Sequence, residues 1–296
     1  MSKTTSYAEV KESVPGWYVK FQAAVLEQLP RPDRLDADTA KRWLSKQSEL
    51  KDALAAALLE QRQDFLVHGH SFVCKDVGSA RQIMGSGMFG AEEWQTMYGV
   101  KFTKKQLREA NKWPWGEEVM NGPCPFNPEK QVKDTHFAFL GVTGINGEPL
   151  TVQKWTKLHP ATGQPKFYFA DNPWYEGQPY TDETTLEFRW HLLLKEIVPG
   201  STEKTPEQQA AMLPPEYEVP STIAEVTKDI LAFRKMNVRL NGGRWAACKE
   251  RTIKTGKVDG NLVSCVGYFV GRGLNVNNWG GDDVGYVGVG ASRKFK

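Results

Sequence analysis

Residues 265–295 read CVGYFVGRGLNVNNWGGDDVGYVGVGASRKF. Glycine recurs every few positions in this stretch and in the residues just before it, which indicates tight turns and positive backbone dihedral angles. Between the glycines, apolar residues alternate loosely over 263–266, 274–276 and 284–289, as they do in antiparallel strands. The end of the sequence therefore predicts a small sheet of short strands with little helix.

Upstream of this stretch, the sequence predicts both helices and strands. Ser221 is an N-cap candidate, and the apolar residues that follow it recur at helical spacing, which predicts a helix to about residue 235. Thr205 followed by Pro206 predicts the start of another helix, which Pro214 ends. Compact apolar runs at 135–142, 166–169 and 190–197 have the length of buried strands.

The N-terminal part has a different pattern. The leucines of 36–65 fall on one stripe and predict an amphipathic packing helix, with a coiled-coil partner as the alternative. Residues 72–98 predict a short strand, a loop and a helix, and Thr103 with Gln106 forms a capping box for a further short helix. The two prolines of 121–126 predict an irregular loop. We thus expect an α+β protein with a mainly helical region at 1–130 and a second domain at 131–296.

Composition excludes several classes of function. The chain has 296 residues, with 38 basic and 35 acidic side chains and a formal charge of +3, so no strong field would attract nucleic acid. No apolar run is long enough for a membrane span. The polar start of the sequence holds no signal-peptide core, so a cytoplasmic location is the default and display on a cell or virion would need a non-classical route. Four scattered cysteines favour reduced thiols.

No catalytic motif is evident. Gly85-Ser86-Gly87 lacks the strand and the partner residues of a phosphate loop or a nucleophile elbow. His68, His70 and Cys74 are spaced as at the start of some zinc sites, but no fourth ligand follows at a recognisable spacing. We therefore expect no enzyme activity, no metal and no cofactor.

Three pieces of the quoted stretch carry a resemblance to a known family. These are Val266-Gly267 with Phe269, then Gly273-Leu274 with Val276 and Trp279, and finally GVGASRKF at 288–295. At this spacing they resemble the variable region of target proteins of diversity-generating retroelements. The predicted helix at 221–235, the residues Arg239, Leu240 and Trp245, and the segment 198–205 are similar to what precedes that region in the family.

The resemblance implies a C-type-lectin-like fold, related to formylglycine-generating enzymes, with the variable region at about 240–295. Fixed residues would hold the scaffold, and our candidates for these are Phe269, Gly273, Leu274, Val276 and Trp279. Solvent-facing residues between them would be rewritten at adenine positions of a template. The candidate variable, ligand-contacting residues are Ala247, Cys265, Tyr268, Val270, Arg272, Asn275, Asn277, Asn278, Gly280, Gly281, Asp282, Asp283, Gly285 and Tyr286.

The function implied is non-enzymatic recognition of a protein or cell-surface macromolecule, with a monomer favoured. The residue chemistry agrees, since amides, carboxylates and an aromatic ring in one irregular loop form an adaptable surface. Three alternatives remain: a polar hairpin loop with no ligand, a fixed calcium-dependent lectin, and a cysteine oxidase using Cys248 and Cys265. The lectin lacks its full acidic and proline triplet, and the oxidase would need Cys265 at a position that the resemblance treats as variable.

Overall fold

The computed structural model describes Lys41 and residues 77–160, 162–168, 170–171, 173–281 and 284–295. Apart from Lys41, these residues belong to a single unit of the chain, Phe72–Lys296. Apart from Lys41, the helix predicted over 36–65 lies outside the described residues, as do His68, His70 and Cys74.

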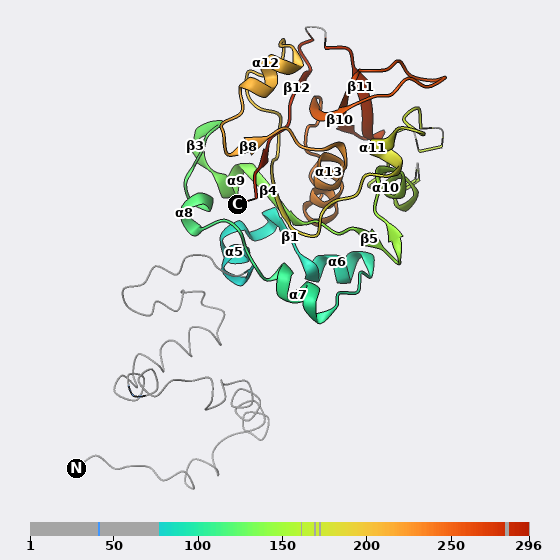
Figure 1. Cartoon of the computed structure of the whole chain (residues 1–296). Helices are drawn as coiled ribbons and strands as arrows, with labels where there is room; N and C mark the ends of the chain where they lie inside the picture. Colours follow the sequence, from blue (N-terminus) through green and yellow to red (C-terminus); the bar gives the residue numbers. More distant parts are fainter. Residues whose placement is uncertain are drawn as a thin grey trace, which may run out of the picture. The chain divides into compact units, whose positions relative to one another are not determined.

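The fold is α+β, with helices and strands interleaved along the chain (Figure 1). The helices are α5 (Val77–Met84), the 3-10 turn η1 (Gly85–Gly87), α6 (Ala91–Tyr98), α7 (Lys104–Ala110), α8 (Glu117–Met120), α9 (Val132–Thr135), α10 (Val152–Leu158), α11 (Pro179–Asp182), α12 (Pro206–Ala211) and α13 (Thr222–Met236). The strands are β1 (Met88–Phe89), β2 (Pro123–Cys124), β3 (Asn127–Gln131), β4 (His136–Leu140), β5 (Gly144–Ile145), β6 (Glu148–Pro149), β7 (Trp190–Leu194), β8 (Tyr217–Glu218), β9 (Trp245–Arg251), β10 (Val263–Val270), β11 (Gly273–Trp279), β12 (Val287–Val289) and β13 (Ser292–Arg293).

Five strands form the first large sheet, in the order β1-β4-β7-β13-β8. At its centre, β4 pairs antiparallel with β7, with Phe137 opposite Leu193. Every residue of both strands is buried. The strands predicted at 135–142 and 190–197 are therefore confirmed, with shorter bounds.

Four strands form the second sheet, in the order β11-β10-β9-β12. The β10–β11 and β10–β9 pairs are antiparallel, whereas β12 runs parallel to β9. The three predicted strands near the end of the sequence are thus confirmed as β10, β11 and β12. The strand predicted at 166–169 is not formed as such, because its described residues contribute only an isolated bridge from Phe167 to Leu274.

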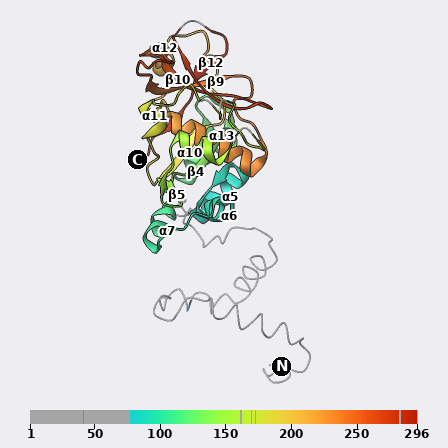
Figure 2. The ribbon, with the colours of Figure 1, turned by 90° about the vertical axis from the view of Figure 1, so that its right-hand side faces the viewer.

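Helix α13 lies between the two sheets, as both views show (Figures 1 and 2). It contacts β4 and β7 of the first sheet and β9, β10 and β11 of the second. Ser221 caps it as predicted, since its hydroxyl accepts a hydrogen bond from the Ala224 amide. Because partners surround the helix, nearly all of its residues are buried, including charged ones on the side away from the predicted apolar stripe.

Capping was predictable from the sequence at two further helices. Thr103 and Gln106 form the expected capping box at α7, and Thr205 and Gln208 form another at α12, where Pro206 is the first helical residue.

Within 72–98, the expected short strand and helix form as β1 and α6, while α5, which was not predicted, precedes them with Ala80 and Met84 buried. A second local prediction was wrong. Pro123 and Cys124 were expected in an irregular loop but form β2, which pairs only with β3. A proline is tolerated here because Pro123 is the first residue of a strand in a two-stranded ribbon.

The main hydrophobic core runs from Ala80 to Val276 and joins both sheets to α13. The domain boundary that we predicted between residues 130 and 131 falls inside this core, since Trp94 and Trp190 belong to the same cluster. None of the described helices combines the length and apolar character that crossing a bilayer requires.

Candidate functional site

Predicted variable residues from three strands share one face of the four-stranded sheet, whereas Asn278 points to the other face. Cys265 lies opposite Ala247 on one side and opposite Asn277 on the other, so these three residues form a row across β9, β10 and β11. Asn275 and Trp279 lie on the same face, because side chains two apart in a strand point the same way. We call this the outer face, since the opposite face packs against α13.

The inner face carries the predicted scaffold. Phe269, Leu274 and Val276 are buried in the main core cluster. Trp279 is also buried, but it lies on the outer face with Val263 and Trp245. Gly273 has φ of +124°, and a Cβ there would lie 2.7 Å from the Lys166 carbonyl oxygen, which explains why this scaffold position needs glycine. The scaffold residues are therefore buried, as predicted.

The outer face itself is more buried than expected. Ala247, Cys265 and Asn275 are 3%, 2% and 8% exposed, so the prediction that they face solvent was wrong. The reason is that Trp245, Val263, Trp279 and Val287 form a second hydrophobic cluster on this face, with Val284 packed against it. Asn277 and Asn278 are half-buried. The side-chain oxygen of Asn275 has no hydrogen-bond partner in the described structure.

Two tyrosines form the accessible part of this region. Tyr268 is 45% exposed and Tyr286 is 54% exposed. The Tyr268 ring stacks on the Trp245 indole, with centroids 5.9 Å apart and planes 15° apart. The Trp245 amide donates a 2.9 Å hydrogen bond to the Tyr286 carbonyl oxygen. We call Trp245, Tyr268 and Tyr286 the aromatic patch.

The remaining candidates lie in turns around the sheet. Arg272, Gly280 and Gly285 are exposed, whereas Val270 and Gly281 are half-buried. At the β10–β11 turn, the Arg272 guanidinium donates to the Tyr168 hydroxyl at 3.4 Å. Asp282 and Asp283 lie outside the described residues.

A bulge in β10 aims the Tyr268 side chain out of the sheet. The pairing of β10 with β11 shifts register between Gly267 and Val270, and Tyr268 has φ of +44°. Gly267 permits this path, because a Cβ there would lie 2.3 Å from the Arg244 carbonyl oxygen. That same oxygen accepts a 2.7 Å hydrogen bond from the Tyr268 amide. A bulky residue in the left-handed region is strained, and bulges of this kind re-aim side chains at binding sites.

Sequence reasoning missed Trp245 as a part of this site. It was taken only as a residue that precedes the variable region, because nothing in its spacing reveals which ring it will meet. Its contact with Tyr268 depends on the β9–β10 register, which places Trp245 opposite Gly267.

The two cysteines of the oxidase alternative do not face one another. Cys265 packs on the outer face with Trp245, whereas Cys248 belongs to the main core on the α13 side. Burial raises the pKa of both thiols, that of Cys248 well above its usual range. A thiolate is the reactive form, so this environment is that of structural cysteines.

Buried histidines also have structural partners. His136 Nε2 and the Tyr217 hydroxyl share a 3.1 Å hydrogen bond. Burial lowers the pKa of this histidine to about 3. Burial likewise lowers the pKa of His191 to about 4. Within the described ranges, no group of three or more His, Cys, Asp or Glu side chains is arranged to hold a metal ion.

Comparison with known proteins gives no relative for this chain: no family model, no curated protein and no solved structure matches it.

Proposed function

We propose that this chain is a non-enzymatic binding protein that recognises a macromolecular ligand through the exposed residues around its four-stranded sheet. The observation that carries the proposal is the separation, within β10 and β11, of buried and accessible neighbours. Phe269 is fully buried while Tyr268, the residue before it, is 45% exposed. Exposed positions tolerate change at a cost of a few tenths of a kcal/mol, whereas core positions do not.

The finer form of the proposal is a C-type-lectin-like scaffold whose surface is rewritten by a retroelement. It is supported by the resemblance of residues 265–295 and by the burial of all the tested apolar scaffold residues. Because Ala247, Cys265 and Asn275 are buried, we remove them from the set in direct contact with ligand. Asn278 is also removed, because it follows Asn277 in β11 and so points to the α13 side, and Asp282 and Asp283 lie outside the described residues. The contact set is then Tyr268, Val270, Arg272, Asn277, Gly280, Gly281, Gly285 and Tyr286, with Trp245 added as the ring that supports Tyr268.

The aromatic patch would supply the anchors. Tyrosine and tryptophan give large contact areas at a low cost in side-chain entropy, and such residues dominate many interfaces. Arg272 and the half-buried Asn277 would add polar contacts at the rim. A protein or cell-surface ligand suits this arrangement better than a fixed metabolite, because Tyr268 and Tyr286 are 45% and 54% exposed.

Two libraries in a surface-display format test this proposal. One randomises Tyr268, Arg272 and Tyr286, and the matched one randomises Phe269, Leu274 and Val276. We expect most members of the first library to resist protease as the parent does, and most members of the second to be cleaved. Selection of the first library on an arbitrary folded protein such as ubiquitin should yield binders. Equal protease resistance of the two libraries would contradict the separation of buried scaffold residues from exposed contact residues.

The retroelement itself is tested in the genome. A reverse-transcriptase gene and a near-copy of the segment encoding residues 240–295, differing at adenines, should lie beside this gene. If both are absent, the retroelement part of the proposal is wrong, and the protein has a fixed binding surface.

The alternative functions have their own tests. A calcium-dependent lectin should bind sugars in a calorimetric titration with calcium, and the binding should disappear with a chelator. For the oxidase, loss of an oxygen-dependent activity in Cys248→Ala would favour it, although the separation of Cys248 from Cys265 across the sheet argues against a cysteine pair.

A further inference from the structure

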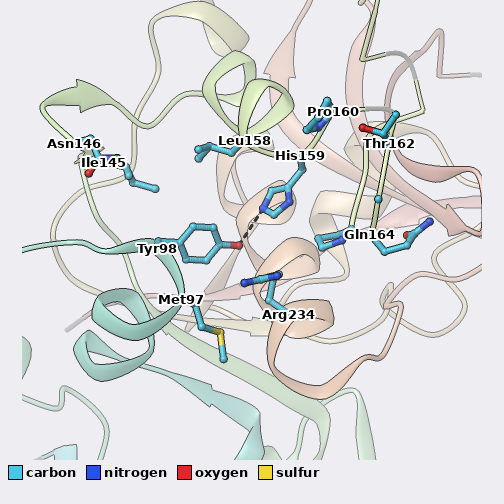
Figure 3. Close-up of a pocket in the computed structure, with 12 residues that line it drawn as sticks. Met97, Tyr98, Ile145, Asn146, Leu158, His159, Pro160, Thr162, Gln164 and Arg234 are labelled. Carbon is cyan, nitrogen blue, oxygen red and sulfur yellow. Dashed lines mark hydrogen bonds between the residues drawn. The ribbon is translucent and has the colours of Figure 1, made fainter.

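A cavity of about 450 Å³ lies between α6, the segment after α10 and the last turn of α13 (Figure 3). Its volume is in the range of small-molecule sites. It shares no lining residue with the contact set proposed above, so the two sites can be tested separately. Among the residues that line it are Met97, Tyr98, Ile145, His159, Pro165 and Arg234.

One polar wall of the cavity is held in place by Tyr98 and His159. The Tyr98 hydroxyl and the His159 Nε2 are 3.1 Å apart, the contact drawn as a dashed line in Figure 3. Burial lowers the pKa of His159 to about 4, and the ring also hydrogen-bonds the Pro165 backbone. The neutral ring has one N–H donor and one acceptor nitrogen, so it can hold both neighbours at once.

This wall is also rigid. The Trp155 indole packs against both rings, at centroid distances of 5.4 Å to Tyr98 and 5.7 Å to His159. Trp155 is itself fully buried and donates a 2.9 Å hydrogen bond to the Thr227 hydroxyl on α13. The wall is therefore formed before any ligand arrives, which reduces the entropy cost of binding.

Arg234 supplies the charge at the cavity. Its guanidinium lies 5.6 Å from the centroid of the Tyr98 ring, and Arg234 is an exposed residue. In the described part of the chain, no carboxylate forms an ion pair with it, and none lines the cavity. The next residue, Lys235, differs in this respect because its ammonium already pairs with Glu93 at 2.7 Å.

We propose that this cavity binds a small organic monocarboxylate with a flat apolar body. The carboxylate would accept two parallel hydrogen bonds from N–H groups of Arg234, because the spacing of the guanidinium donors matches that of the two carboxylate oxygens. The apolar body would contact apolar members of the lining such as Met97 and Leu158. A phosphate dianion fits less well, because one guanidinium faces it and the negative end of the α13 dipole lies close by.

The test uses the full-length chain and sodium benzoate as the probe, with saturation-transfer NMR as the readout. Benzoate should bind saturably with a Kd on the order of 1 mM, a plausible affinity for so few atoms. Benzyl alcohol, which has the ring without the charge, should bind about tenfold more weakly or worse. Inorganic phosphate should compete poorly.

Arg234→Gln should weaken benzoate binding by about tenfold or more, because it removes the charge-assisted hydrogen bonds. Arg108→Gln is the matched control, since Arg108 is an exposed arginine in the last turn of α7 and does not line the cavity. It should leave the benzoate Kd unchanged. Thermal unfolding of both variants should match the parent, which excludes misfolding as the cause of any loss.

Absence of saturable binding, or equal affinity of the parent and Arg234→Gln, would overturn the proposal. Competition by inorganic phosphate as strong as that by benzoate would also overturn it in favour of a general anion site. None of these results would bear on the aromatic patch.

Discussion

The Tyr268 ring lies nearly parallel to the Trp245 indole, although the Tyr268 backbone is in the left-handed region. Stacking of this kind contributes about 0.5–1.5 kcal/mol beyond the buried area. A left-handed conformation costs a residue with a Cβ about 1–2 kcal/mol. The two contributions are similar in size, so the exposed ring is held in place with little net effect on stability.

This balance predicts an inverted order for two substitutions. In an ordinary strand, alanine is more stable than glycine by about 0.5–1 kcal/mol. At position 268 we expect Tyr268→Gly to be more stable than Tyr268→Ala by about 1 kcal/mol, because glycine alone relieves the left-handed strain. Urea denaturation of the two variants measures the difference. The ordinary order, with alanine the more stable, would mean that the bulge is not present in solution.

Substitutions of buried and of exposed residues in this region should differ sharply in their effect on stability. Phe269→Ala removes a fully buried ring from the core against α13 and should lower the free energy of unfolding by about 3–5 kcal/mol. Tyr286→Ala changes an exposed side chain and should lower it by less than about 1 kcal/mol. Chemical denaturation of both variants gives the comparison, and similar losses would show that Tyr286 belongs to the core.

The buried histidines predict a loss of stability in mild acid. Below pH 6.5 a histidine in the unfolded chain takes up a proton, whereas His136 in the folded chain does so only near pH 3. The unfolded state therefore binds more protons, and the free energy of unfolding falls as the pH drops through this window. One such histidine accounts for up to about 1.4 kcal/mol per pH unit. His136→Gln should flatten the slope measured by denaturation at pH 4–6.5, and an unchanged slope would refute this assignment.

Asp229 predicts the opposite pH effect. It is fully buried in α13, neither carboxylate oxygen has a hydrogen-bond partner, and Glu225 and Glu196 lie nearby. Burial raises its pKa well above the usual value, against the attraction of Lys228, which lies 3.6 Å away. The folded state then keeps its proton above pH 3.8, where the unfolded chain loses it, so this residue lowers stability as the pH rises.

Asp229→Asn should consequently stabilise the protein by about 1 kcal/mol or more at pH 8 and by less at pH 4. Thermal unfolding at the two pH values provides the measurement. Glu225 still neutralises Lys228 in this variant, since these two side chains form the closer ion pair. A larger gain at pH 4 than at pH 8 would reverse the sign and rule the argument out.

The sequence was informative wherever a local rule decides the structure. The N-caps Ser221, Thr205 and Thr103 mark helix starts correctly. Each side chain accepts a hydrogen bond from the backbone amide three residues later, so the cap needs no distant partner. Strands β4 and β7 were predictable as uninterrupted apolar runs, as expected of strands with cover on both faces.

Features that depend on distant pairing could not be predicted. The burial of Cys265 depends on neighbours from β9 and β11, and on Trp245 and Trp279 at the two ends of the face. The residues that line the cavity beside Arg234 are also far apart in sequence, since Tyr98, His159 and Arg234 come from three separate segments. No spacing rule connects them.

The position of β13 has a consequence for the order in which the five-stranded sheet can be completed during synthesis. This strand pairs with β7 on one side and β8 on the other, with Ser292 opposite both Leu193 and Glu218. The five-stranded sheet therefore stays divided until residues 292–293 have left the ribosome. Synthesis that stops before residue 292 therefore leaves β7 and β8 without the strand that joins them.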